Sequence, residues 1–255
     1  MKIFLTGGTG LLGRAFVKIL TERGISFVAP DSSNLDLLDT DAVDNFIKTE
    51  KPDQIIHCAA YTAVDLAETE RKKCWDLNVS VLENLLIYNL PIVHFSTDYV
   101  FNTDQKPVLI DHERDPLNYY GETKAAAEER LENYTGTWHN VRTTWLYGPD
   151  GEGFPAKIKK KAESGEPLTV VDDQFGRKTL STDLAEFVLG DLSPGSKLPS
   201  EPGLNLSLGH HHYQSPGPVH SWYDWAREIT DTEIIPISAE SLNLAARRPK
   251  NSVLV

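Results

Sequence analysis

Tyr120 and Lys124 lie four residues apart in the segment Asn118-Tyr119-Tyr120-Gly121-Glu122-Thr123-Lys124. In a helix, residues at this spacing share one face, so a phenol and an ammonium group are placed side by side. Tyrosine titrates at about 10, and a nearby positive charge lowers that pKa. The pair could therefore act as a general acid near neutral pH. A surface tyrosine beside a solvated lysine has the same spacing, so this interpretation needs support from elsewhere.

The amino terminus carries a glycine pattern that fits dinucleotide binding. Lys2–Thr6 has the length of a strand, Gly7, Gly10 and Gly13 follow, and a helical segment begins at Arg14. Gly7 permits a tight turn, Gly10 admits a pyrophosphate, and Gly13 lets the helix pack on the strand. The helix N-terminus offers free N–H groups to phosphate. The G-x-x-G-x-x-G spacing is typical of short-chain dehydrogenase/reductases.

Asp31 follows a second expected strand, Ser26–Ala29, at about the distance expected of a ribose-binding acid. A carboxylate at this place accepts hydrogen bonds from a ribose 2′-hydroxyl and repels a 2′-phosphate. Ser32 and Ser33 follow, with no lysine or arginine. The cofactor is expected to be NADH or NADPH, with NADH favoured by Asp31. A simple turn acid is the alternative.

The composition excludes several classes of partner. The 255 residues include 37 acids against 25 Lys and Arg, a net charge of −12, which argues against nucleic acid and anionic membranes. Cys58, expected in a buried strand, and Cys74, expected on a helix, suggest neither a disulfide framework nor a zinc site. No apolar run approaches the ~20 residues of a membrane span. Met1 runs directly into the first strand, so we expect a cytoplasmic protein without a signal peptide.

The chain alternates strands and helices, which predicts an α/β fold: a Rossmann-type doubly wound parallel sheet with a small C-terminal substrate-binding lobe. Ligands bind at the carboxyl ends of such strands, where Gly7, Asp31, Ala60 and Thr97 should converge. The expected strands are Lys2–Thr6, Ser26–Ala29, Gln54–Ala59, Pro91–Ser96 and one within Trp138–Tyr147. The expected helices are Arg14–Leu20, Asp41–Lys48, Glu70–Asn89 and one containing Tyr120.

Residues 1–147 are expected to form the dinucleotide-binding domain, rejoined by about 179–192. Residues 148–178 and 193–255 are expected to form the small lobe. In the second half of the chain we expect helices at Phe154–Ser164, Leu180–Gly190 and Ser221–Thr230, a surface loop at Asp191–Gly203 and a short strand at Leu204–Leu208. The apolar segment Leu168–Val171 follows the first of these helices.

Two clusters invite a ligand interpretation. His210-His211-His212 could suggest a metal, but adjacent residues do not easily converge on one ion, so a solvated loop is favoured and no metal site is expected. Lys157, Lys159, Lys160 and Lys161 form a basic cluster. A solvated helix face and a role facing a phosphate are equally good explanations of it.

Several stretches together resemble the extended short-chain dehydrogenase/reductases, and within them the dTDP-4-dehydrorhamnose reductase family. The resemblance covers nearly the whole chain, and its Ser-Thr-Asp-Tyr-Val-Phe and Ala-Arg-Arg-Pro-x-Asn-Ser stretches are specific to this subfamily and its close relatives. The stretches are Thr6–Gly13, Leu35–Leu37, Cys58–Asp65, Phe95–Phe101, Asn118–Lys124, Arg142–Tyr147, Asp173–Gly176 and Ala246–Ser252.

This resemblance implies reduction of the 4-keto group of a nucleotide-linked 6-deoxyhexose, most simply dTDP-4-dehydro-L-rhamnose. It implies that Tyr120 protonates the ketone, that Thr97 hydrogen-bonds it, and that Lys124 holds the nicotinamide ribose and lowers the pKa of Tyr120. Asp98 and Trp145 would contact the sugar. The implied cofactor-binding residues, together with Gly7, Gly13 and Asp31, are Gly10, Leu11, Leu12, Asp36, Leu37, Ala59, Ala60, Tyr61, Thr62, Tyr120 and Lys124.

The chain also departs from the family pattern. Arg177-Lys178 replaces a small residue and proline, Arg14-Ala15 lacks an acid linked to a metal-bound dimer, and the chain stops at Val255, some tens of residues earlier than usual. A homodimer is left open. Two alternatives stand: a non-catalytic cofactor-binding subunit resembling the methionine adenosyltransferase β subunit, and a reductase or epimerase acting on another sugar nucleotide.

Overall fold

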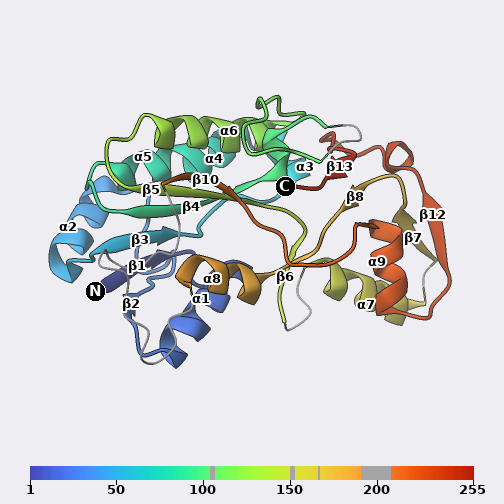
Figure 1. Ribbon diagram of the computed structural model, residues 1–255, viewed down its shortest axis with the longest axis horizontal. Helices are drawn as coiled ribbons and strands as arrows, with labels where there is room; N and C mark the ends of the chain where they lie inside the picture. The colour runs from blue at the N-terminus through green and yellow to red at the C-terminus, as the bar shows by residue number, and fades with distance from the viewer. Residues whose placement is uncertain (104–106, 150–152, 166, 191–207) are drawn as a thin grey trace.

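The computed structural model describes residues 1–103, 107–149, 153–165, 167–190 and 208–255. At its centre is a parallel sheet of strand order β10-β5-β4-β3-β1-β2, shown in Figure 1. The chain runs from β1 to β2 on one side and then to β3 on the other, so the strand order reverses beside β1. The strands are β1 (Lys2–Thr6), β2 (Ser26–Val28), β3 (Gln54–His57), β4 (Ile92–Thr97), β5 (Trp138–Thr143) and β10 (Gly209–His212).

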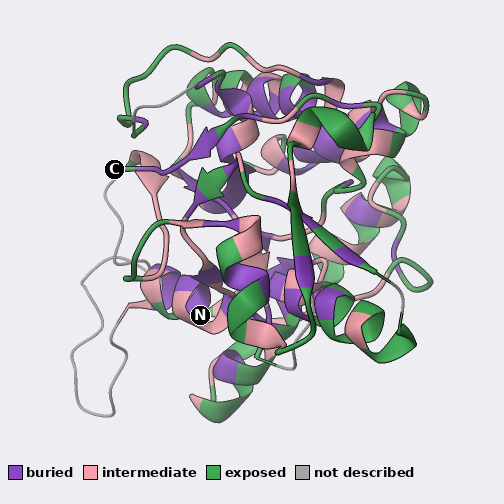
Figure 2. Ribbon diagram, turned by 90° about the vertical axis from the view of Figure 1, so that its right-hand side faces the viewer, coloured by how far each residue is buried: buried purple, intermediate pink, exposed green. Residues whose placement is uncertain are grey.

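Helices cover both faces of this sheet, which confirms the Rossmann-type doubly wound fold. One face carries α1 (Leu11–Glu22) and α8 (Ser181–Leu189), and the other carries α2 (Thr40–Glu50), α4 (Arg71–Trp75), α5 (Val81–Leu86) and α6 (Tyr119–Glu132). An apolar core lies on each face of the sheet, and alternating side chains of β1 belong to one or the other. Ile3 and Leu5 pack with α1 and α8, and Phe4 packs with α2, α5 and α6. Figure 2 shows burial along the strands and on the inner sides of the helices.

The helix expected at Glu70–Asn89 is interrupted. A π-helical turn at Asp76–Ser80 separates α4 from α5. Asn78, in this turn, is buried and pairs with both backbone groups of Tyr61, at 2.8 Å and 3.2 Å, and with Thr123 Oγ1 at 2.9 Å. A π-helical turn contains one residue more than an α-helical turn, and here it accompanies the inward-facing amide of Asn78. The helical periodicity of the sequence does not reveal that this polar side chain is buried.

The second lobe is built from short elements at the carboxyl end of the sheet. Its core is an apolar cluster that includes Ile158, Leu168, Ala226 and Ile234. Strand β7 pairs with β12, β8 lies between β11 and β13, and β6 pairs with β9. The elements are β6 (Leu146–Tyr147), α7 (Phe154–Ser164), β7 (Leu168–Val171), β8 (Phe175–Gly176), β9 (Thr179–Leu180), β11 (His220–Ser221), α9 (Trp222–Ile229), β12 (Ile234–Ile237) and β13 (Asn251–Ser252). Short helical elements occur at α3 (Val64–Ala67), Asp98–Val100 and Ala239–Leu242.

The structure corrects three expectations. His210-His211-His212 is not a solvated loop: it lies in β10, which pairs in parallel with β5 and so joins the central sheet although residues 193–255 were assigned to the small lobe. Strand β3 ends at His57, so Cys58 follows the strand. Leu208 precedes β10, and the rest of the strand expected at Leu204–Leu208, like the loop at Asp191–Gly203, lies outside the described residues.

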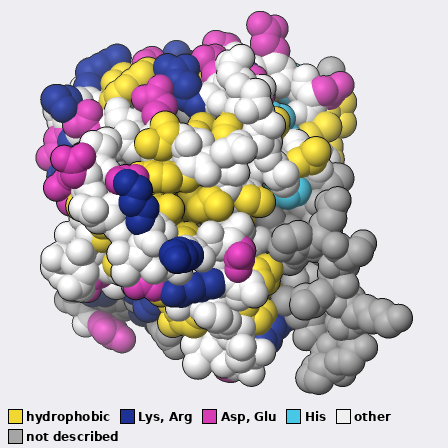
Figure 3. Space-filling view, turned by 90° about the vertical axis from the view of Figure 1, so that its left-hand side faces the viewer, with side chains coloured by type: hydrophobic (Ala, Val, Ile, Leu, Met, Phe, Trp, Pro, Cys, Tyr) yellow, Lys and Arg dark blue, Asp and Glu magenta, His cyan; other side chains and the backbone are white. Residues whose placement is uncertain are grey.

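The surface at the end of the molecule opposite the small lobe carries both signs of charge. Figure 3 shows Lys and Arg side chains interspersed with Asp and Glu around a band of hydrophobic side chains. Ion pairs near the amino terminus and α2 include Lys2–Glu50 and Lys48–Asp44, both at 2.5 Å. The acidic surplus therefore does not make this face uniformly acidic. Among the described residues, no helix has the length and apolar character needed to cross a membrane.

Candidate active site

A cavity of about 620 Å³ lies where the carboxyl ends of β1, β3, β4 and β5 meet the small lobe. Each of these strands is followed by residues that line it, as expected at the edge of a doubly wound sheet. The small lobe supplies α7 and α9 residues to the remaining wall. The lining from the sheet side consists of Gly10–Gly13, His57–Ala60, Thr62, Val64, Phe95–Tyr99, Tyr120, Lys124 and Thr143–Leu146, and that from the lobe consists of Gly153, Phe154, Lys157, Trp222 and Trp225.

The glycine loop has no room for side chains. Gly7 has a φ of +67°, and a Cβ atom there would lie 2.6 Å from the backbone nitrogen of Ala59. A Cβ atom on Gly13 would lie 2.0 Å from the carbonyl oxygen of Gly7. Helix α1 begins after Gly10, which provides no side-chain cap, so the first N–H groups of the helix remain available beside the cavity. These residues fit a dinucleotide pyrophosphate.

The structure brings together most of the expected cofactor-binding residues but not all of them. Gly10, Leu11, Leu12, Gly13, Ala59, Ala60, Thr62, Tyr120 and Lys124 line the cavity. Gly7, Asp31, Asp36, Leu37 and Tyr61 lie outside its lining. The Tyr61 hydroxyl donates to Glu70 Oε2 at 2.9 Å, which points its side chain toward α4. Leu37 packs in the core under α2 and α5.

Asp31 is engaged within its own loop. Its Oδ1 accepts hydrogen bonds from the backbone N–H and the hydroxyl of Ser33, at 2.9 Å and 2.6 Å, and from Asn34. These contacts, of which the Ser33 hydroxyl is the strongest, hold the pKa of Asp31 below its usual value. Without a bound cofactor, Asp31 therefore acts as an acid that stabilises its own turn, which was the alternative to ribose binding.

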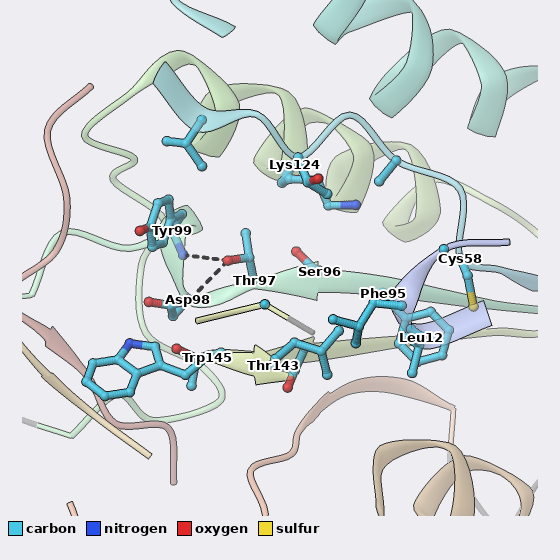
Figure 4. Close-up of a pocket in the computed structure, with 18 of the residues that line it drawn as sticks. Leu12, Cys58, Phe95, Ser96, Thr97, Asp98, Tyr99, Lys124, Thr143 and Trp145 are labelled. Atoms are coloured by element: carbon cyan, nitrogen blue, oxygen red, sulfur yellow. Dashed lines mark hydrogen bonds between the residues drawn. The ribbon is translucent and has the colours of Figure 1, made fainter. Parts of the chain in front are cut away.

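Thr97, Asp98 and Tyr120 converge on one spot in the cavity. The Thr97 hydroxyl donates to Asp98 Oδ1 at 3.0 Å and accepts the N–H of Tyr99 at 3.2 Å, as the dashed lines in Figure 4 show. Tyr120 lines the same cavity, and Thr97 is among the neighbours that favour the ionised form of its phenol. Burial raises the pKa of Asp98 to about 6, against the opposing effect of hydrogen bonds from Ser252 and Thr97. A carbonyl here would meet two hydroxyl groups.

Helix α6 holds Tyr120 in this position because both ends of its first turn are fixed. Asn118 caps the helix by accepting the N–H of Gly121 at 2.8 Å, and its amide donates to the carbonyl of Arg247 at 2.7 Å. A Cβ atom on Gly121 would lie 2.2 Å from the carbonyl oxygen of Tyr99. The glycine thus allows α6 to approach the segment that follows β4.

The expected lowering of the Tyr120 pKa is wrong for the protein alone. Burial, followed by the charges of Asp98 and Tyr99, raises the pKa of this phenol well above its ordinary value, so it is protonated and ready to donate. Lys124 shares the face of the helix, but its ammonium lies 2.9 Å from His94 Nε2. Burial lowers the pKa of Lys124 to about 8.

The aromatic wall opposite the sheet was not predicted, apart from Trp145. The rings of Trp145 and Trp222 stack at 3.6 Å between centroids with an angle of 14°. Trp225 lies parallel to Trp145 at 5.9 Å, and Phe154 packs against Trp222 at 4.7 Å. A three-residue spacing of Trp222 and Trp225 on an amphipathic helix was the available signal. Lys157, one of the basic cluster, lines the cavity beside this wall.

Comparison with known proteins agrees with this geometry. The family model described as RmlD substrate binding domain matches residues 1–255. The chain belongs to the dTDP-4-dehydrorhamnose reductase family. It is 33% identical to a dTDP-4-dehydrorhamnose reductase of Aggregatibacter actinomycetemcomitans, over 99% of this chain and 90% of that protein.

Solved structures place the family's fold on the whole chain. A dTDP-4-dehydrorhamnose reductase of Clostridium acetobutylicum superposes with a TM-score of 0.88 at 34% identity, covering 100% of this chain and 90% of its own. One from Bacillus anthracis, in complex with NADP, has a TM-score of 0.87 at 29% identity, with the same coverage. The family assignment and the geometry of the cavity therefore agree.

Proposed function

We propose that this protein is an NAD(P)H-dependent oxidoreductase that reduces the 4-keto group of a nucleotide-linked 6-deoxyhexose. The simplest substrate is dTDP-4-dehydro-L-rhamnose, which becomes dTDP-L-rhamnose. The observation that carries this proposal is the convergence of Thr97, Tyr120 and Lys124 with the glycine loop on one cavity. The names of the relatives support the same reaction.

The reaction needs a proton and two hydrogen-bond donors at the carbonyl oxygen. A reduced nicotinamide cofactor, held by the glycine loop and Lys124, would supply the hydride for the carbonyl carbon. The Tyr120 O–H donates its proton to the oxygen as that bond forms, so no free alkoxide accumulates. The Thr97 hydroxyl, which donates to Asp98 in the protein alone, hydrogen-bonds the same oxygen. Lys124, which lines the same cavity, would contribute its charge and would donate hydrogen bonds to the cofactor ribose.

The two ends of the substrate meet different walls. We place the deoxysugar between Asp98 and Trp145, because both line the cavity beside Thr97, as Figure 4 shows. The nucleotide then extends toward Trp222, Trp225 and Lys157. Aromatic rings offer a surface to a base, and the Lys157 ammonium offers a charge to a diphosphate.

For the cofactor we favour NADH over NADPH. Asp31 follows β2, and Ala29 of the same segment lies next to Gly8 of the glycine loop. Its hydrogen bonds keep the Asp31 carboxylate ionised, and an ionised carboxylate repels a 2′-phosphate. The structure of the Bacillus anthracis relative is a complex with NADP. We expect a higher kcat/KM with NADH, and a gain in NADPH use on Asp31→Asn.

The central experiment incubates the protein with dTDP-4-dehydro-L-rhamnose and either NADH or NADPH, and follows the absorbance of the reduced cofactor. Consumption with one of them, with dTDP-L-rhamnose as the product, supports the proposal. Failure with both while the cofactor binds tightly points to the regulatory-subunit alternative. Activity only on a different nucleotide sugar points to the other alternative.

A variant of Lys157 tests the position of the nucleotide. Lys157→Gln should raise the substrate KM about tenfold with little change in kcat, because it removes a charge from the cavity wall. Lys160→Gln is the matched control, since Lys160 belongs to the same cluster and helix but does not line the cavity. Equal effects of the two variants would contradict this placement.

A further inference from the structure

Lys124 is an enclosed cation whose hydrogen-bond partner is a neutral ring. Its side chain is 2% exposed, and its Nζ lies 2.9 Å from Nε2 of His94 on β4. Among the described residues, no carboxylate forms an ion pair with it. Buried lysines are ordinarily paired with an acid, so this partner calls for a functional explanation.

The nearest acid along α6 is already occupied. Glu128, one turn after Lys124, accepts hydrogen bonds from Arg142 Nε and Nη2 at 2.9 Å and 2.7 Å, and from Arg114 Nη1 at 3.1 Å. Two guanidinium groups thus neutralise this carboxylate. Its charge still favours the protonated form of Lys124, but its oxygens are directed to the arginines.

A second buried histidine, His57, packs against the ring of His94. The His94 ring stacks on His57 of the adjacent strand β3, with 5.5 Å between centroids and an angle of 29°. His57 Nδ1 lies 2.7 Å from Thr6 Oγ1, and that oxygen accepts the N–H of Ala59 at 3.2 Å. This chain of contacts runs through β4, β3 and β1 to the segment beside the glycine loop, so the His94 ring has a fixed orientation.

Both rings are neutral. An ammonium group can only donate, so Nε2 of His94 is the acceptor and its proton is on Nδ1. Burial, and after it the charge of Lys124, lowers the pKa of both His57 and His94. A charged imidazole would repel Lys124 and would leave its ammonium without this acceptor.

We propose that His94 is a positioning residue for the reaction proposed above: it accepts a hydrogen bond from Lys124 and fixes the ammonium in the cavity that Tyr120 also lines. One of the three N–H bonds of Lys124 is directed into the sheet, and two remain for the cavity. A neutral acceptor holds the ammonium without cancelling its charge. The charge therefore stays available to Tyr120 and to the cofactor.

The titratable groups that face Lys124 come from four elements. They are His94 on β4, His57 on β3, Cys74 on α4 and Glu128 on α6. Of these, His94 is the one that accepts a hydrogen bond from the ammonium. Removing this acceptor destabilises the charged form, so the pKa of Lys124 should fall further. A reaction that needs the ammonium should then be lost at lower pH.

The test measures Lys124 directly in the cofactor-free protein. Carbon-13-labelled lysine is titrated by NMR, and the Lys124 resonance is identified by its loss in Lys124→Met. His94→Phe should move the titration midpoint to lower pH by about one unit, the size expected for a lost hydrogen bond to a charged group. His94→Gln, which keeps an acceptor, should restore most of the shift. His57→Phe is the matched control: it keeps an aromatic ring for His94 to stack on and removes no acceptor from Lys124, so it should leave the midpoint in place.

The pH profile of kcat/KM gives a second readout. Its alkaline limb should move to lower pH in His94→Phe and return in His94→Gln. A merely structural role would lower activity or stability without moving this limb. The proposal is overturned if folded His94→Phe titrates like the parent, or if His57→Phe shifts the midpoint equally. If His94→Phe does not fold, His94→Met serves as the variant without the ring acceptor.

The two proposals can fail separately. The NMR titration requires neither substrate nor cofactor, so absence of ketone reduction would leave the contact between His94 and Lys124 testable. Conversely, an unshifted midpoint in a protein that reduces the ketone would overturn only the role of His94.

Discussion

The phenol hydroxyl of Tyr120 is the atom on which the proposed chemistry depends most directly. Tyr120→Phe should lower kcat by about 10²–10⁴-fold, because the general acid is lost while the cavity keeps its shape. Cofactor binding, measured by fluorescence titration, should change little. Tyr119→Phe is a close control, because Tyr119 does not line the cavity. Its ring packs instead against Arg71, whose guanidinium carbon lies 3.6 Å from the ring centroid. Full activity in Tyr120→Phe would refute the assigned role.

Asp98 links the chemistry of the site to stability. Its folded-state pKa of about 6 exceeds the ordinary 3.8 because of burial, so the folded protein binds more protons than the unfolded chain between these pH values. Stability therefore falls as the pH rises through this window, by roughly 3 kcal/mol. Asp98→Asn should unfold at higher urea concentration than the parent at pH 7, and this advantage should shrink toward pH 4, while activity is lost.

Asp224 provides a control of opposite sign. Its pKa is lowered, chiefly by the backbone N–H of Ser221 at the start of α9. Asp224→Asn should destabilise the protein above its ordinary pKa, and the loss should diminish as the pH falls. If both variants change stability in the same direction with pH, the assignment of the burial effect to Asp98 is wrong.

The sequence predicted which chemical groups form the site, but it did not predict the surroundings that set their pKa values and hydrogen-bond partners. The glycines and the Tyr120–Lys124 pair could be recognised because their spacing is local. The raised pKa of Tyr120 and the partner of Lys124 depend on β4 and β3, which approach α6 only in the folded chain. His57 and His94 are distant in sequence, and no local pattern indicates that their rings stack.

At the scale of the elements, the junction of β1, the glycine loop and α1 leaves little room for a larger side chain. Gly13→Ala would place a methyl group 2.0 Å from the Gly7 carbonyl, where only backbone can move. We expect a loss of about 1–3 kcal/mol in the free energy of unfolding, together with weaker cofactor binding. Calorimetry and fluorescence titration measure the two effects. Gly217→Ala, with no atom within 4 Å of its new methyl group, should behave like the parent.

The regular elements of the sheet were predictable because their apolar runs are continuous and bounded by glycines and polar residues. Helix Glu70–Asn89 was predicted without its π-helical turn, since the burial of Asn78 depends on Tyr61. Strand β10 was missed because three histidines do not resemble a strand. They are accommodated by polar neighbours: His210 by Glu132 and Asn140, and His212 by the backbone of Val255.

At the scale of the whole molecule, the aromatic wall joins the two halves. Trp145 follows β5, and Trp222 belongs to α9 of the small lobe. A Cβ atom on Gly176 would lie 2.6 Å from Cε2 of Trp145, so Gly176→Ala should displace this ring. We expect the substrate KM to rise several-fold while the cofactor Kd stays unchanged. An unchanged KM in steady-state kinetics would contradict the placement of the sugar against Trp145.

Strand β10 has a consequence for biosynthesis. The strand beside β5 is translated only after the small-lobe elements from β6 to β9 and the helix α8 have emerged. Until the ribosome reaches Gly209–His212, the backbone groups on one edge of β5 have no strand to pair with, and open edges recruit other chains. Nascent chains released near residue 190 should therefore aggregate, and a chaperone that shields strand edges should raise the yield of the complete protein.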